Sequence, residues 1–179
     1  MSARAPAQLK KVAVNLKLGV LSVSGTWEAD ESEQRAAWEL YVELITRIAI
    51  EELKPNEGLL REALSSLYAL FGETRKILRK YGASVARPKG RGRLSLGHIA
   101  VAVLNSAIRP VLAYWHPELL AYESTRTPNV SPTAHERAWN RNEELRKALN
   151  ELRATLMPYA YLLAQAAGVP VIATGRRHR

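Results

Sequence analysis

The clearest chemical feature of the sequence is a stretch that is rich in basic side chains and contains no acid. The chain has a formal net charge of +9, and residues 75–93 alone supply +8 of it. A nucleic-acid backbone favours such a cluster, because each phosphate that is neutralised releases a condensed counterion. We therefore predict that eight residues contact a nucleic-acid backbone: Arg75, Lys76, Arg79, Lys80, Arg87, Lys89, Arg91 and Arg93.

The basic residues fall into two groups, and neither group requires nucleic acid as its partner. The first four cations fall near the end of a predicted helix, where the helix dipole favours positive charge, although like charges at i,i+4 repel each other. The other four fall in an exposed, mobile loop predicted from Ala83 to Leu94, which is rich in proline and glycine. These four loop cations have three possible roles: contact with nucleic acid, contact with an acidic protein surface, or simple exposure to solvent.

Part of this loop resembles an AT-hook, a short motif that binds the minor groove of DNA through an Arg-Gly-Arg core. Arg91, Gly92 and Arg93 match the core, and Leu94 stands where the motif has a proline. The resemblance covers the seven residues 87–93, and it implies that the loop contacts DNA.

A second pattern lies at the end of the same loop. Arg93 and His98 have the spacing Arg-x4-His, which resembles the catalytic signature of HEPN-domain ribonucleases, a helical family. The resemblance implies that Arg93 and His98 act on the scissile phosphate of RNA. The sequence departs from the family at Leu94, where a polar residue is usual, and in placing the arginine before the helix. Ribonuclease activity is therefore kept as an alternative function.

A third pattern combines polar and aromatic side chains in an apolar segment: Asn105, Arg109, Trp115 and His116. Asn105 and Arg109 lie one helical turn apart. A buried arginine needs a partner, because an isolated charge is costly away from water. These four residues form either a polar pocket or a structural ion pair that fixes the helix register. We favour the ion pair, with one of three acids as partner: Glu39, Glu43 or Glu62.

Other site chemistry has no sequence signal. The chain lacks cysteine, which excludes disulfides, thiolate zinc sites and iron–sulfur ligation. His98, His116 and His135 lack metal-binding helix spacing. There is no P-loop, dinucleotide fingerprint or nucleophile elbow. We therefore expect no cofactor and no metal, and we favour a non-enzymatic protein over the ribonuclease alternative.

The N-terminal part of the domain predicts a β-hairpin followed by two helices. Residues 11–25 alternate apolar and polar residues about a turn at Gly19, the pattern of a half-buried hairpin. The first helix should begin at Asp30, which has capping-box spacing to Glu33, and end near Leu53 before Pro55. The second should run from a cap at Asn56 to Gly82.

Two further helices follow the basic loop. One is capped by Ser95 and should kink or end at Pro110, with a break at His116-Pro117 and a short helix to Glu123. The other should begin at Ser131-Pro132, kink at Pro158 and close at Gly168. The fold is therefore predicted to be mainly α, a four-helix-bundle-like domain with kinked third and fourth helices and an N-terminal hairpin.

The domain organisation predicted is a flexible N-terminus over 1–10, a single helical domain over 11–170 and a basic tail over 171–179. We interpret the weakly charged stretches 94–117 and 154–175 as core helices and expect no transmembrane segment. The lack of cysteine fits a cytoplasmic protein.

The predicted function is a non-enzymatic binding protein in a larger complex or homo-oligomer. The rival is a protein–protein adaptor that uses the hairpin edge or a helical face.

Overall fold

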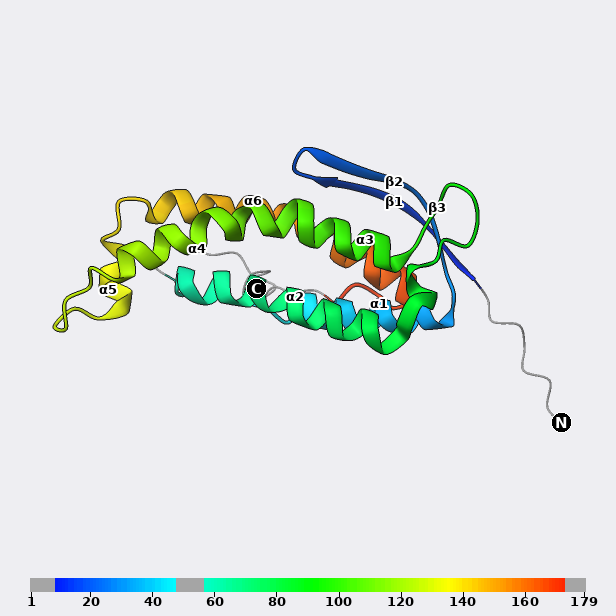
Figure 1. Ribbon diagram of the computed structural model, residues 1–179, viewed down its shortest axis with the longest axis horizontal. Coiled ribbons are helices and arrows are strands. Elements are labelled where there is room, and N and C mark those ends of the chain that lie inside the picture. The colour runs from blue at the N-terminus through cyan, green and yellow to red at the C-terminus, as the bar shows by residue number, and fades with distance from the viewer. Residues whose placement is uncertain (1–8, 48–56, 173–179) are drawn as a thin grey trace, which may run out of the picture.

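The computed structural model describes residues 9–47 and 57–172. It confirms the predicted mainly α fold with an N-terminal hairpin. Long helices lie side by side, with the short helix α5 at one end and the hairpin over the other half (Figure 1). The α-helices are α1 (Glu31–Ile45), α2 (Leu60–Tyr81), α3 (Leu96–Val103), α4 (Arg109–Glu123), α5 (Pro132–Arg137) and α6 (Asn142–Ala167).

The hairpin pairs strand β1 (Lys10–Leu18) with strand β2 (Leu21–Ala29) in antiparallel register around a turn at Gly19, which has φ +68°. On β1, Val12, Val14, Leu16 and Leu18 are buried, while the residues between them are exposed, as the alternation predicts. Strand β2 extends beyond the predicted end of the hairpin at residue 25. A third strand, β3 (Arg93–Leu94), pairs parallel with β2, and this strand was not predicted.

The first helix begins as predicted and ends earlier. Asp30 Oδ1 accepts a hydrogen bond from the Glu33 backbone N–H at 2.9 Å, and the Glu33 carboxylate accepts one from the Asp30 N–H. The helix ends at Ile45 rather than Leu53, because the last turn tightens and the Arg47 N–H bonds the Leu44 carbonyl. Residues 48–56, including the predicted cap Asn56, lie outside the described residues.

The helix predicted to kink or end at Pro110 continues to Glu123. Between α3 and α4 lies a π-helical segment, η3 (Leu104–Ile108), in which the Arg109 N–H bonds the carbonyl of Leu104, five residues back. Such a segment takes up one extra residue, and it stands where Pro110 lacks an N–H donor. The predicted break at His116-Pro117 is wrong, because α4 runs through Pro117.

The predicted fourth helix is in fact two. Helix α5 starts at the predicted Ser131 cap, whose Oγ accepts from the Ala134 N–H at 3.1 Å, and ends at Arg137. A turn follows, in which the Asn142 amide donates to the Glu136 carbonyl at 2.8 Å. Helix α6 then runs through Pro158 to Gly168, which ends it in the left-handed conformation as predicted.

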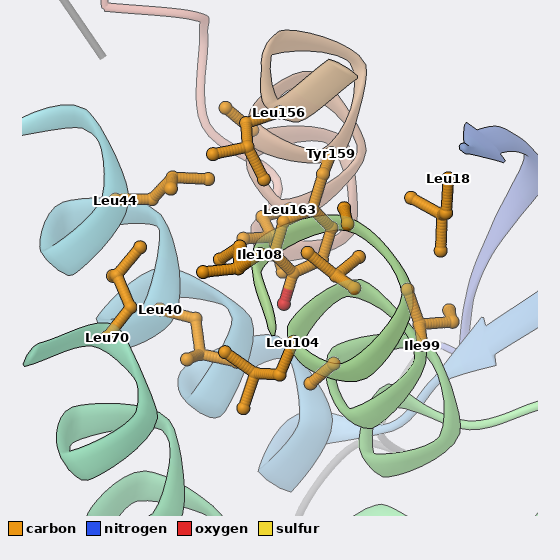
Figure 2. Close-up of a cluster of buried hydrophobic side chains, with 14 of the residues drawn as sticks. Leu18, Leu40, Leu44, Leu70, Ile99, Leu104, Ile108, Leu156, Tyr159 and Leu163 are labelled. Carbon is orange, nitrogen blue, oxygen red and sulfur yellow. The ribbon is translucent and has the colours of Figure 1, made fainter. Parts of the chain in front are cut away.

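The core lies where the hairpin and the long helices meet. Figure 2 shows Leu18 of β1, Leu40 of α1, Leu70 of α2, Ile99 of α3 and Leu156 of α6 pointing into one cluster. By length and composition, the helix Leu96–Glu123 would also be able to cross a membrane, and half of its most apolar part is buried inside the protein.

Candidate functional site

The basic stretch lies at one end of the molecule. It covers the last turns of α2, a short 3-10 helix η2 (Gly82–Ala86), a loop and β3. In Figure 1 these segments follow one another at the end where β3 meets the hairpin. The predicted loop over 83–94 is therefore partly regular structure, because η2 and β3 account for its two ends.

Four of the eight basic residues have acidic partners, and the fold brings three of these partners from other elements. Lys76 pairs with Glu73 at 2.8 Å, and Arg93 pairs with Glu28 of β2 at 3.1 Å. The other two pairs join the stretch to α1 or its cap, which are distant in sequence. Lys80 pairs with Glu39, and Lys89 pairs with Asp30 at 2.6 Å.

The cations lower the pKa of the carboxylate in two of these pairs. Burial acts to raise the pKa of Glu39, but hydrogen bonds from Lys80 and Tyr81 outweigh it and hold that pKa below its usual value. Burial also opposes the shift at Asp30, where Lys89 and the Glu33 N–H lower the pKa. Both acids are therefore ionised at neutral pH, and they neutralise part of the predicted basic surface.

The other four basic residues are all arginines, and all are exposed: Arg75, Arg79, Arg87 and Arg91. Within residues 9–47 and 57–172, no acidic side chain forms an ion pair with any of them. On α2 the division follows the helical period. Lys76 and Lys80 lie beside Glu39 of α1, whereas Arg75 and Arg79 form a neighbouring stripe, and Arg75 reaches α4.

Two close contacts hold the ends of the loop. Gly25 of β2 has φ +153°, and a Cβ atom there would lie 3.3 Å from Leu94 of β3. A Cβ atom at Gly97, in the first turn of α3, would lie 3.1 Å from Ala86 of η2. Because glycine permits both approaches, the loop between η2 and β3 leaves the body at fixed points and exposes Arg87 and Arg91.

The predicted buried ion pair of Arg109 is wrong. Arg109 and Asn105 are exposed, and Asn105 Oδ1 accepts from Arg109 Nε at 3.1 Å and Nη2 at 2.9 Å. The guanidinium also lies over the ring of Phe71 on α2, 5.2 Å from its centroid. The π-helical segment turns this side of the helix outward, so Arg109 avoids burial and needs no carboxylate.

The other two members of that constellation lie apart. Trp115 is buried, edge-on to Trp139 and 4.6 Å from the guanidinium of Arg141, and is a packing residue. His116 is half-buried and contacts Arg61, whose Nη1 lies 2.8 Å from His116 Nδ1. The four residues therefore do not form the single pocket considered from the sequence.

The hydrogen bond to Arg61 fixes the protonation of His116. A guanidinium can only donate, so Nδ1 accepts and the proton of the neutral ring is on Nε2. Burial, and secondly the charge of Arg61, lower the pKa of His116 and keep the ring neutral. Glu123 holds Arg61 through two guanidinium nitrogens, with a shortest distance of 2.7 Å. Nε2 is buried and has no hydrogen-bond partner among the described residues.

Arg109 and His116 meet residues of α2 in a groove of about 300 Å³. Tyr68, Phe71 and Arg75 form one wall on α2, and Leu112 and Ala113 belong to the α4 wall. Two guanidinium groups thus lie beside aromatic and apolar side chains, and none of the described lining residues is acidic. The sequence held one signal of this wall, since Tyr68, Phe71, Arg75 and Arg79 share a helical stripe. Nothing in the sequence placed α4 against it.

Arg93 and His98, the residues that resemble a ribonuclease signature, have different surroundings in the structure. The half-buried Arg93 guanidinium is held by Glu28, while His98 is exposed in the first turn of α3, where its backbone N–H donates to Ser95 Oγ at 3.3 Å. The catalytic role of this pair stays a prediction.

A larger groove of about 650 Å³ lies between β1 and the end of α6, lined by Lys10, Lys11 and Gln165 among others. In the part of the chain that the structure describes, no three His, Asp or Glu side chains are grouped so as to hold a metal ion.

Comparison of the chain with protein-family models, with curated proteins and with solved structures finds no match.

Proposed function

We propose that the protein is a non-enzymatic binding protein, part of a larger complex, that contacts a nucleic-acid backbone through four arginines: Arg75, Arg79, Arg87 and Arg91. One observation carries the proposal. The other four cations of the basic stretch have acidic partners, whereas these four are exposed without an acidic partner among the described residues.

The charge and chemistry of these four residues suit phosphate. Each guanidinium presents a planar fork of donors that matches two phosphate oxygens. Like charges that are left unpaired at one end of a protein raise the local potential, which attracts an anionic partner. Because phosphate contacts position a protein without reading bases, we expect little sequence specificity from them.

The test measures how binding to labelled random-sequence DNA and RNA depends on salt, by fluorescence anisotropy. We expect log affinity to fall linearly with log salt, with a slope of roughly −0.7 to −0.9 per phosphate contacted. Replacing Arg79, Arg87 and Arg91 with glutamine should make that slope shallower by roughly 2–3 units, because each contact releases about one counterion. Arg75 is kept in this variant because it also lines the groove.

A matched control removes three exposed cations elsewhere: Lys17, Arg126 and Lys147 to glutamine. Both variants lower the net charge equally. The proposal requires the control to bind nearly as the unaltered protein does. An equal loss in both variants would mean that net charge alone attracts nucleic acid, and absence of binding at about 50 mM salt would overturn the proposal, since non-specific electrostatic binding is strongest at low salt.

A protein–protein adaptor is the second candidate, and the sheet provides the observation that favours it. In the described sheet the strand order is β1-β2-β3, so the outer edge of β1 pairs with no strand. Such an edge can accept a strand from a partner, although Lys10, Lys11 and Lys17 on β1 oppose pairing. A partner protein should co-purify with this chain even after nuclease treatment and at moderate salt. Loss of that partner when Asn15 is replaced by proline would support this function.

A further inference from the structure

We infer that the groove between α2 and α4 binds an unpaired nucleotide, so that the protein prefers single-stranded to duplex nucleic acid. This inference rests on the proposed binding of a nucleic-acid backbone and adds the kind of strand that is bound. It depends on the groove residues Tyr68, Phe71, Arg75, Arg109 and His116, of which only Arg75 belongs to the proposed backbone contacts.

The charge of the groove suits a phosphate group. Arg109 is held by two neutral partners, the amide oxygen of Asn105 and the ring of Phe71. Its side chain is therefore positioned while its charge is not cancelled. Arg75 lies across the groove without an ion pair in the described structure, and no carboxylate of the described residues lines the walls. Both arginines are thus available to an anion, and their planar donor groups match phosphate oxygens.

The apolar surface between those charges suits a nucleobase. Tyr68 is 64% exposed although it is a large aromatic residue, and with Phe71, Leu112 and Ala113 it gives the groove an apolar wall. Nucleobases stack on aromatic rings and on guanidinium planes. The volume of about 300 Å³ is at the small end of ligand-binding pockets, which is suitable for one nucleotide rather than a folded partner.

His116, which lines the groove, also has a buried hydrogen-bond donor that lacks an acceptor. Arg61 fixes the His116 proton on Nε2, and this atom is buried without a partner among the described residues. A buried donor left unpaired costs free energy. The ring also meets Tyr68 edge-on, with centroids 5.9 Å apart, so a ligand that stacks on Tyr68 lies close to His116.

The groove connects with the exposed arginines. Arg79 lies one turn beyond Arg75 on the same stripe of α2, and the loop with Arg87 and Arg91 follows the end of that helix. A single strand can place a base in the groove and continue along this stripe. A duplex cannot do so without unstacking a base, and it therefore meets only the arginines.

The experiment compares one labelled random-sequence oligonucleotide, free and annealed to its complement, at the same low salt. We expect the single strand to bind at least about five-fold more tightly than the duplex, the gain expected from one stacked base. Tyr68→Ala removes the stacking ring, and Ala113→Leu fills the groove without changing any charge. Each should weaken single-strand binding by about five-fold or more and leave duplex binding within about two-fold.

One further variant and two controls separate the groove from other effects. Tyr161→Ala removes another exposed tyrosine, on α6, and should change neither affinity. Arg109→Lys keeps the charge but loses the planar group, and should weaken the single strand more than the duplex. Thermal unfolding of every variant shows that the fold is retained.

The possible results distinguish this inference from the proposed function. Equal affinity for single strand and duplex, or equal losses of both in Tyr68→Ala and Ala113→Leu, would overturn the groove inference. If binding is still steeply salt-dependent and is weakened by loss of Arg79, Arg87 and Arg91, the proposed function stands. If neither form of nucleic acid binds, both proposals are wrong.

Discussion

Glu136 shows how one side chain can replace a local helix cap. Helix α2 starts after Leu59, which offers no side-chain acceptor. The buried Glu136 carboxylate of α5 instead accepts the N–H groups of Leu60, at 2.9 and 3.0 Å, and of Arg61, at 3.3 Å. Its negative charge also lies at the positive end of the α2 dipole. A residue 76 positions away in sequence therefore defines where α2 begins.

Replacing Glu136 with alanine should lower the free energy of unfolding by about 2–3 kcal/mol, because it leaves buried N–H groups unpaired. The matched change Glu143→Ala removes an exposed carboxylate from the first turn of α6 and should cost under about 1 kcal/mol. Urea denaturation followed by circular dichroism measures both. Equal losses would show that the Glu136 contacts with α2 contribute no more than an exposed charge does.

His116 makes stability depend on pH. Its pKa is lowered in the folded protein, by burial and then by Arg61, whereas Glu123 acts in the opposite direction. Arg75 and Arg109 are the other charged residues that line the groove beside His116. The unfolded chain therefore takes up a proton on this histidine below about pH 6.5 while the folded protein does not.

The stability that His116 contributes is lost on the acid side. It is complete above about pH 6.5 and disappears as the pH falls through the lowered pKa, because the unfolded chain then binds more protons. In His116→Asn, whose amide oxygen can still accept from Arg61, the unfolding free energy should change less between about pH 7 and pH 5. Exposed His98→Asn is the control. Identical pH profiles for His116→Asn and the unaltered protein would contradict the expectation.

At the scale of elements, the continuous helix from α3 to α4 has two buried faces that are out of phase. Leu96, Ala100, Val103 and Ala107 are buried at regular helical spacing. The series then resumes one residue later, in a set that is also regularly spaced: Ile108, Leu112, Trp115 and Leu119. The segment η3 absorbs this extra residue, so both halves face the core although Pro110 lies between them.

Deleting Ser106 should therefore be tolerated. It removes the extra residue from η3 and brings the two buried series into one α-helical phase, with an expected cost below about 2 kcal/mol. Deleting Ala113 should instead prevent stable folding, because it turns Trp115 and Leu119 by about 100° away from the core. Thermal unfolding compares the two deletions, and greater damage from loss of Ser106 would show that the two buried series are not out of phase by one residue.

At the scale of the whole molecule, the fold sorts charges that are uniform along the sequence. Acids from β2, α1 and the α1 cap meet Arg93, Lys80 and Lys89. Between residues 87 and 93, cations with and without an ion pair alternate. Two paired or two unpaired cations can therefore be replaced with the same change in net charge, and the effects on stability can be compared. Paired residues contribute to docking of the loop, whereas unpaired ones repel each other in the folded state.

Replacing Lys89 and Arg93 with glutamine should lower the unfolding free energy by about 1–2 kcal/mol, since each breaks a half-buried ion pair. Replacing Arg87 and Arg91 should change it by less than about 0.5 kcal/mol. Thermal unfolding at low and high salt measures both doubles. If they behave alike, the division of the loop into structural and exposed cations is wrong.

Local signals determined most of the elements. The alternation in β1, the capping box of Asp30 and Glu33, and the glycines at 82 and 168 mark boundaries that the structure confirms. The failures have two kinds of cause. Strand β3 depends on pairing with β2, which is distant in sequence. The end of α1, the turn between α5 and α6, and the passage of a helix through Pro110 depend on local hydrogen bonds that periodicity does not reveal.

Periodicity, capping and composition are local properties, so they were sufficient to predict a mainly helical protein whose excess charge lies in residues 75–93. The packing of the elements determines which charges remain available and where the groove lies. An ion pair such as Lys80 with Glu39, and a groove that joins Tyr68 to Arg109, depend on how helices distant in the chain pack against each other. Helical periodicity defines one face of an element, but the packing of apolar surface selects the element that meets it.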